Sequence, residues 1–196
     1  MQTFASLITN RVTCRNFSDQ ELPREEINEL INTATWVPSG SNNQPWHFVV
    51  ITDRDKLLSY SDAAKTAWLA TLEDNPHMHQ YEKYIRDPEY NIFYDAPALV
   101  IVYGNRESYW HVYDCSMVAY NLHLLAEERG LGCCWIGFAH NILAEPAVKR
   151  GLGIPEQYDL VAPVILGRPA QGKSSSRNLN PRKDFTISCF DGGAIL

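Results

Sequence analysis

The segment Pro38-Ser39-Gly40-Ser41-Asn42-Asn43-Gln44-Pro45-Trp46 gathers the side chains best suited to hold a flat, polar-edged ligand. Its prolines fix φ and its glycine permits positive φ, so the backbone has a defined shape. Its Ser, Asn and Gln groups supply hydrogen-bond donors and acceptors within a short stretch. The same composition is also typical of an ordinary helix-to-strand turn, because an apolar run begins directly afterwards at His47.

Two arginines flank a hydroxyl group in the segment Arg11-Val12-Thr13-Cys14-Arg15. Arginine forms forked, charge-assisted hydrogen bonds to phosphate oxygens, and a hydroxyl adds one more. The segment therefore suits a phosphate group, although a solvated pair of surface arginines would have the same sequence. Arg177, beyond a flexible Ser-rich stretch, is a further candidate for a phosphate contact.

The run Leu131-Gly132-Cys133-Cys134-Trp135-Ile136-Gly137-Phe138 offers backbone rather than side-chain chemistry. Gly137 lets the main chain lie close against a flat ring, and an N–H here could reach a ring nitrogen. The alternative is a strand end followed by a turn glycine.

Aromatic and imidazole groups are concentrated between Trp68 and Tyr94. Such side chains stack on flat molecules, or simply pack as a helical excursion on the body of the protein. His77 and His79 alone are a weak metal signal, because a metal site needs further ligands, and we expect no metal.

These segments, in this order, resemble the nitroreductase family of FMN-dependent oxidoreductases. The family has a Pro-Ser-x-x-Asn-x-Gln-Pro-Trp loop and an Arg-x-Ser-x-Lys/Arg element. Here Thr13 replaces the serine and keeps its hydroxyl, while Val12 stands where the family often has Arg or His. The run from Asp114 to Leu122, with its exit Gly130-Leu131-Gly132, resembles the family's central helix.

The resemblance implies one set of cofactor-binding residues and no catalytic side chain. The FMN-binding residues that it implies are Arg11, Val12, Thr13, Arg15, Pro38, Ser39, Gly40, Asn42, Gln44, Cys134, Trp135, Ile136, Gly137 and Arg177. Cys134 to Gly137 would lie along the isoalloxazine ring. The segment 67–94 would be a lid-like insertion that partly covers the flavin and sets substrate choice.

The implied fold is an α+β sandwich, with a mixed sheet flanked by helices, in one domain spanning 1–196 with a C-terminal arm at 178–196. The implied activity is a ping-pong cycle, in which NAD(P)H reduces the flavin and a nitroaromatic, quinone or similar acceptor then takes two electrons. The alternatives are reduction of free flavin or of activated C=C bonds, and a flavin-binding sensor or store without turnover.

Hydrophobic periodicity predicts the elements that must position these residues. The expected helices are 3–10, one beginning at Pro23, 53–69, 108–129 with Gly130 as its C-terminal cap, and 141–151. The expected strands are 47–51, 98–103, 133–138 and 158–166. The interleaving of helices and strands is typical of α+β or α/β proteins.

Bulk composition excludes several other classes. A formal net charge of -6 argues against a nucleic-acid binder, and no segment has the ~20 apolar residues of a membrane span. Met1 to Phe4 lack the features of a signal peptide, so a cytoplasmic location is expected. The five cysteines form no disulfide or cluster pattern, and we expect them reduced and buried.

Two features favour a homodimer with FMN in its interface. The 108–129 helix is apolar around much of its girth, and the arm carries Phe185, Ile187 and Phe190 without a core of its own. The resemblance implies that Arg11, Thr13 and Arg15 hold FMN from one subunit, while the Pro38 loop reaches it from the other.

Overall fold

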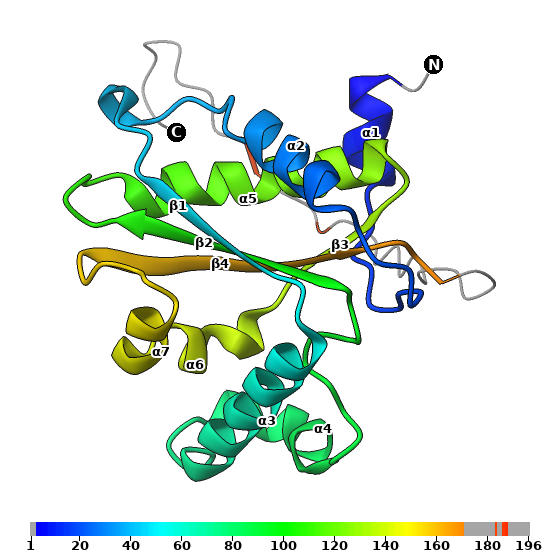
Figure 1. The fold of residues 1–196 in the computed structure, drawn as a ribbon, viewed down its shortest axis with the longest axis vertical. Helices are drawn as coiled ribbons and strands as arrows, with labels where there is room; N and C mark the ends of the chain where they lie inside the picture. Colours follow the sequence, from blue (N-terminus) through cyan, green and yellow to red (C-terminus); the bar gives the residue numbers. More distant parts are fainter. Residues whose placement is uncertain (1–2, 171–182, 184–185, 188–196) are drawn as a thin grey trace.

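A four-stranded sheet with helices on both faces forms the body of the chain (Figure 1). The computed structural model describes residues 3–170, 183 and 186–187. Arg177 and nearly all of the 178–196 arm therefore lie outside the described residues. The strand order is β1-β2-β4-β3, and all three pairings are antiparallel. The strands are β1 (Trp46–Ile51), β2 (Ala98–Asn105), β3 (Gly132–Trp135) and β4 (Tyr158–Gly167).

Helices cover the two faces of this sheet in separate groups (Figure 1). One face carries α1 (Phe4–Asn10), α2 (Arg24–Ala34) and α5 (His111–Glu128). The other face carries α3 (Arg54–Ala70), α4 (Glu82–Arg86), α6 (His140–Leu143) and α7 (Pro146–Gly151). Short 3-10 turns occupy Gly40–Asn42, Pro76–Tyr81 and Gly137–Ala139.

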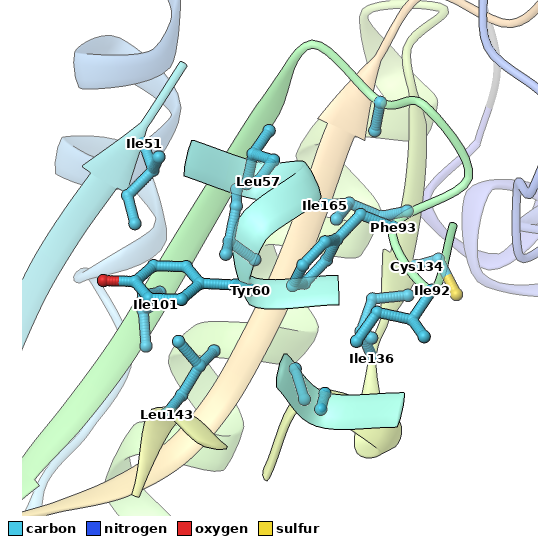
Figure 2. Packing of buried hydrophobic residues seen from close by; sticks show 14 of the residues in the cluster. Ile51, Leu57, Tyr60, Ile92, Phe93, Ile101, Cys134, Ile136, Leu143 and Ile165 are labelled. Carbon is cyan, nitrogen blue, oxygen red and sulfur yellow. The ribbon is translucent and has the colours of Figure 1, made fainter. Parts of the chain in front are cut away.

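Strand β2 divides the hydrophobic core in two. Successive side chains of a strand point to opposite faces, and β2 is buried along nearly its whole length. Ala98, Val100 and Val102 pack with α2 and α5, whereas Leu99, Ile101 and Tyr103 pack on the α3 side. Figure 2 shows the second cluster, where Leu57 and Tyr60 of α3 approach Ile101 and Ile165 of the sheet.

The α+β prediction is confirmed, with three differences in detail. Among the described strands the sheet is antiparallel rather than mixed. Strand β3 ends at Trp135, three residues early, because the chain enters a 3-10 turn at Gly137. The predicted 141–151 helix is two short helices, α6 and α7, because Pro146 cannot donate a helical hydrogen bond and starts a new helix.

Candidate functional site

The Arg11–Arg15 segment lies alongside β3. The backbone N–H of Cys14 donates to the carbonyl oxygen of Cys133 at 3.0 Å, and the Cys14 side chain is buried. A side chain at Gly132 would have no room, because its Cβ would lie 2.5 Å from the Cys14 sulfur. This close packing fixes the arginine segment against the strand that leads to Cys134.

A cavity of about 820 Å³ opens beside the end of β3. It is bounded by Arg15, by the backbone turn after the strand, and by aromatic side chains from the region between α3 and β2. Its lining comprises Arg15, Trp68, His77, Met78, Tyr81, Tyr84, Tyr90, Ile92, Tyr94, Cys134, Trp135, Ile136, Gly137, Phe138 and His140. The structure therefore brings together Arg15, Cys134 to Gly137 and much of the aromatic 68–94 segment.

The turn after β3 presents open backbone to this cavity. The N–H of Ile136 donates to the Pro163 carbonyl at 2.8 Å, which ties the turn to β4. Apart from neighbouring chain atoms, nothing lies within 4 Å of the position that a Cβ on Gly137 would take. Within the described residues, the Gly137 N–H also makes no hydrogen bond. The space beside Gly137 is therefore open to a flat ring.

A cation and an aromatic ring meet in the wall of this cavity. The guanidinium carbon of Arg15 lies 5.9 Å from the centre of the Tyr94 ring. The Trp68 indole donates to the Phe138 carbonyl at 2.9 Å, so this aromatic wall is tied to the turn after β3. The wall therefore has a defined position relative to Gly137.

His123 is a buried neighbour of Arg11 that belongs to none of the sequence motifs. Burial, and to a lesser degree the positive charge of Arg11, lower the pKa of His123 to about 4. Its Nδ1 atom has no hydrogen-bond partner among the described residues. The available signal was its position in the middle of an otherwise apolar helical run, now seen as α5.

The Pro38–Gln44 loop has the defined shape that its composition predicts. Ser41, Asn42 and Gln44 all have positive φ values, and the Ser39 hydroxyl accepts from the Gln44 N–H at 3.0 Å. The N–H of Gly40 donates to both carboxylate oxygens of Asp114, at 3.2 Å each. The buried Asp114 thereby anchors the loop to the first turn of α5.

This loop does not meet the Arg15 cavity within one chain. It leads into Trp46, which pairs with Gly104 of β2, whereas Cys134 pairs with Ile165, the partner of Leu99. Leu99 and Gly104 are five residues apart on β2, so the loop and the cavity are separated by about 17 Å along the strand direction. In Figure 1 the loop before β1 lies at the left and β3 at the right.

A surface rich in apolar side chains lies beside the loop, and we call it the α5 aromatic face. It comprises Trp36, Tyr109, Trp110, Tyr113, Met117 and Tyr120, all of them exposed. A groove of about 560 Å³ runs over part of it. The predicted central helix is therefore buried on one side only, because its other side carries this face.

The profile of the Nitroreductase family matches residues 8–168, most of the chain. The chain belongs to the nitroreductase family. Its relatives include a Methanothermobacter thermautotrophicus protein, named only provisionally as an NADH dehydrogenase/NAD(P)H nitroreductase, with 27% identity over 89% of this chain and 81% of the relative. Chloronitrobenzene nitroreductase of Comamonas testosteroni is 26% identical over 82% of this chain and 84% of its own.

The nitroreductase fold is also seen in the solved structures similar to this chain. A Bacteroides fragilis nitroreductase, solved with bound FMN, has a TM-score of 0.75 and 25% identity, and the match covers 98% of this chain and 97% of that one. The predicted family, fold and class of enzyme are confirmed.

Three further findings concern the cysteines, metal binding and membrane-spanning helices of this nitroreductase-family chain. The described cysteines are free and buried, and burial raises the pKa of the Cys14, Cys134 and Cys133 thiols. Within residues 3–170, 183 and 186–187, no group of three or more His, Cys, Asp or Glu side chains is placed to hold a metal. No helix in this part of the chain is long and apolar enough to cross a membrane.

Proposed function

We propose that this chain is an FMN-dependent oxidoreductase that uses NAD(P)H to reduce nitroaromatic, quinone or similar acceptors in a two-electron, ping-pong cycle. The observation that carries the proposal is the cavity beside Gly137, where open space along the backbone is bounded by an aromatic wall and a guanidinium group. Its volume lies within the ~300–1,000 Å³ of small-molecule sites. The FMN bound to the similar Bacteroides fragilis nitroreductase supports the choice of cofactor.

The residues present suit FMN. Arg11 and Arg15 would supply positive charge for the phosphate, and the Thr13 hydroxyl a further donor. Cys134 to Gly137 would lie along the ring, with the Gly137 N–H as donor to it. When bound, FMN supplies the hydride chemistry, while the protein supplies position, polarity and exclusion of water.

The cavity wall would suit alternating use of one space by two substrates. Trp68, Tyr81 and Phe138 form an apolar and aromatic surface on which either a nicotinamide or a flat acceptor can stack. No side chain needs to act as a catalytic acid or base, and we assign none.

We further propose that the working unit is a homodimer with FMN in its interface. The Pro38–Gln44 loop and the Arg15 cavity lie about 17 Å apart along the sheet, so one chain brings only part of the implied binding set together. The α5 aromatic face beside the loop is the kind of apolar surface that a partner covers. Pro38, Ser39 and Asn42 of one subunit would then complete the site of the other.

The first test identifies the cofactor and its reduction. The purified protein should release FMN on heating, identified by mass, and NADH or NADPH should bleach the bound flavin rapidly in stopped flow. Double-reciprocal plots with a nitroaromatic or quinone should be parallel. FAD, or no flavin after reconstitution, contradicts the cofactor. FMN without bleaching favours a sensor or store, and intersecting plots without substrate inhibition favour two separate substrate sites.

A further inference from the structure

A hydrogen-bonded pair of tyrosines lies in the wall of the cavity. The Tyr90 hydroxyl donates to the Tyr94 hydroxyl at 3.0 Å, and the two rings meet edge to face with centres 5.8 Å apart. Both side chains are half-buried and line the cavity that also holds Gly137. Because Tyr90 donates within the pair, the Tyr94 proton is free to bond a group in the cavity.

A buried lysine holds the segment that carries Tyr90. The ammonium group of Lys65 in α3 donates to the carbonyl oxygens of Asp87, Pro88 and Tyr90, at 3.3, 3.4 and 2.9 Å. One turn earlier in α3, the Ser61 hydroxyl accepts from the N–H of Ile92 at 3.1 Å. A buried charge is costly unless it is fully hydrogen-bonded, so this arrangement fixes the loop firmly.

The backbone at Tyr94 adopts an unfavourable conformation. Tyr94 and Asp95 have φ values of 54° and 56°, the left-handed region that non-glycine residues rarely enter. Asn91 stabilises this bend, since its side chain accepts from the Phe93 N–H and donates to the Asp95 carboxylate, both at 2.9 Å. Strained residues of this kind concentrate at binding sites, and here the Tyr94 ring lies beside Arg15.

The cavity wall carries no negatively charged side chain among its described residues. Its positive charge, Arg15, is taken up by the FMN phosphate under the proposed function. Burial, and to a lesser degree the hydrogen bond to Tyr94, raise the pKa of Tyr90, so this hydroxyl stays neutral and keeps its proton.

We propose that the Tyr90–Tyr94 hydroxyl pair is the specificity-determining contact for the acceptor, and that it selects flat, electron-poor aromatic rings carrying a carboxylate or another oxyanion. The electron-rich rings of the wall stack on the ligand, while the free tyrosine proton bonds its anionic substituent. This inference rests on the proposed function, because it names the acceptors of that same cavity.

The experiment compares three ligands of nearly equal shape and different charge. The FMN-loaded, oxidised protein is titrated calorimetrically, without nicotinamide, with 4-nitrobenzoate, 4-nitrobenzamide and 4-nitrobenzamidine. We expect the affinity to fall in that order. Tyr94→Phe and Tyr90→Phe should each weaken the binding of 4-nitrobenzoate about tenfold, as expected for loss of a hydrogen bond to a charged group. The same variants should weaken the binding of 4-nitrobenzamide much less. Tyr158→Phe, a half-buried tyrosine at the start of β4, is the matched control and should change neither affinity.

The outcomes separate this inference from the function on which it rests. FMN-loaded protein that is bleached by NAD(P)H but binds the carboxylate no better than the amide overturns the inference alone. If the tyrosine variants weaken the binding of the carboxylate and of the amide equally, the inference is overturned as well, because equal losses indicate a general packing effect. Loss of FMN from those variants assigns the pair to the cofactor instead. Absence of FMN from the wild-type protein overturns the proposed function itself.

Discussion

His123, on the buried side of α5, makes the folding stability depend on pH. Its pKa is about 4 in the folded protein, against an ordinary value of 6.5. Between these values the unfolded chain binds more protons than the folded one, so folding stability falls as the pH is lowered through this window. The charged group that faces it is the guanidinium of Arg11.

The His123→Gln variant tests this coupling. Between about pH 7.5 and pH 5, the wild-type protein should lose about 2 kcal/mol of unfolding free energy through this group, whereas the variant should lose that much less. Urea unfolding at the two pH values, at one fixed FMN concentration, measures the difference. An identical pH dependence in both proteins would show that His123 is not the titrating group.

Arg11 is the residue whose loss should affect FMN most directly. A hydrogen bond to a charged group contributes ~1.5–3 kcal/mol, so Arg11→Ala should weaken FMN binding roughly tenfold or more. Fluorescence titration of the apoprotein with FMN measures this. Arg24→Ala, at the exposed start of α2, is the matched control. An affinity unchanged by Arg11→Ala would exclude Arg11 from the site.

At the scale of elements, Lys65 is the link between α3 and the loop before β2. Lys65→Met leaves the carbonyl groups of Asp87, Pro88 and Tyr90 without their donor, which should cost about 1–3 kcal/mol of unfolding free energy. Lys83→Met, on the exposed side of α4, should change the free energy of unfolding by no more than about 0.5 kcal/mol relative to the wild type. Chemical unfolding of the three proteins compares them, and equal stabilities would mean that water replaces the ammonium group.

Periodicity and capping made most elements predictable from sequence. In α2, Ile27, Leu30, Ile31 and Ala34 follow the helical spacing and are all buried. Gly130 ends α5 as expected, with φ at 69° and the Leu131 N–H bonded back to the Ala126 carbonyl at 2.8 Å. These features depend on neighbours in the chain, which a sequence displays directly.

The parts of the site that depend on distant neighbours were not predictable in this way. The distance between the Pro38 loop and the cavity beside Gly137 follows from the strand register along β2. The order of these segments in the sequence, with the Arg11 segment before them, does not reveal that distance. Lys65 reads as an ordinary helix residue until its three carbonyl partners are known. The same holds for Asp114 and Gly40, which are 74 residues apart.

For the whole molecule, the α5 aromatic face determines the expected assembly. Tyr120→Asp places a charge among Tyr113 and Met117 in the groove, and burial of an unpaired charge in an interface is strongly unfavourable. We expect light scattering at low micromolar protein to show a dimer for the wild type and mostly monomer for the variant, with reduced FMN content. Leu58→Glu, an exposed apolar residue of α3 on the other side of the sheet, is the control. An FMN-loaded, active wild-type monomer would contradict the dimer.

The separation of the Pro38 loop from the Arg15 cavity has a genetic consequence. If each site takes its arginines from one chain and its loop from the other, a chain defective at Arg11 and a chain defective at Ser39 damage complementary halves. A mixed dimer of the two then places both lesions in one site and leaves the other site intact. Two alleles that are each inactive alone should therefore restore activity when expressed together, whereas two alleles with lesions in the same half should not.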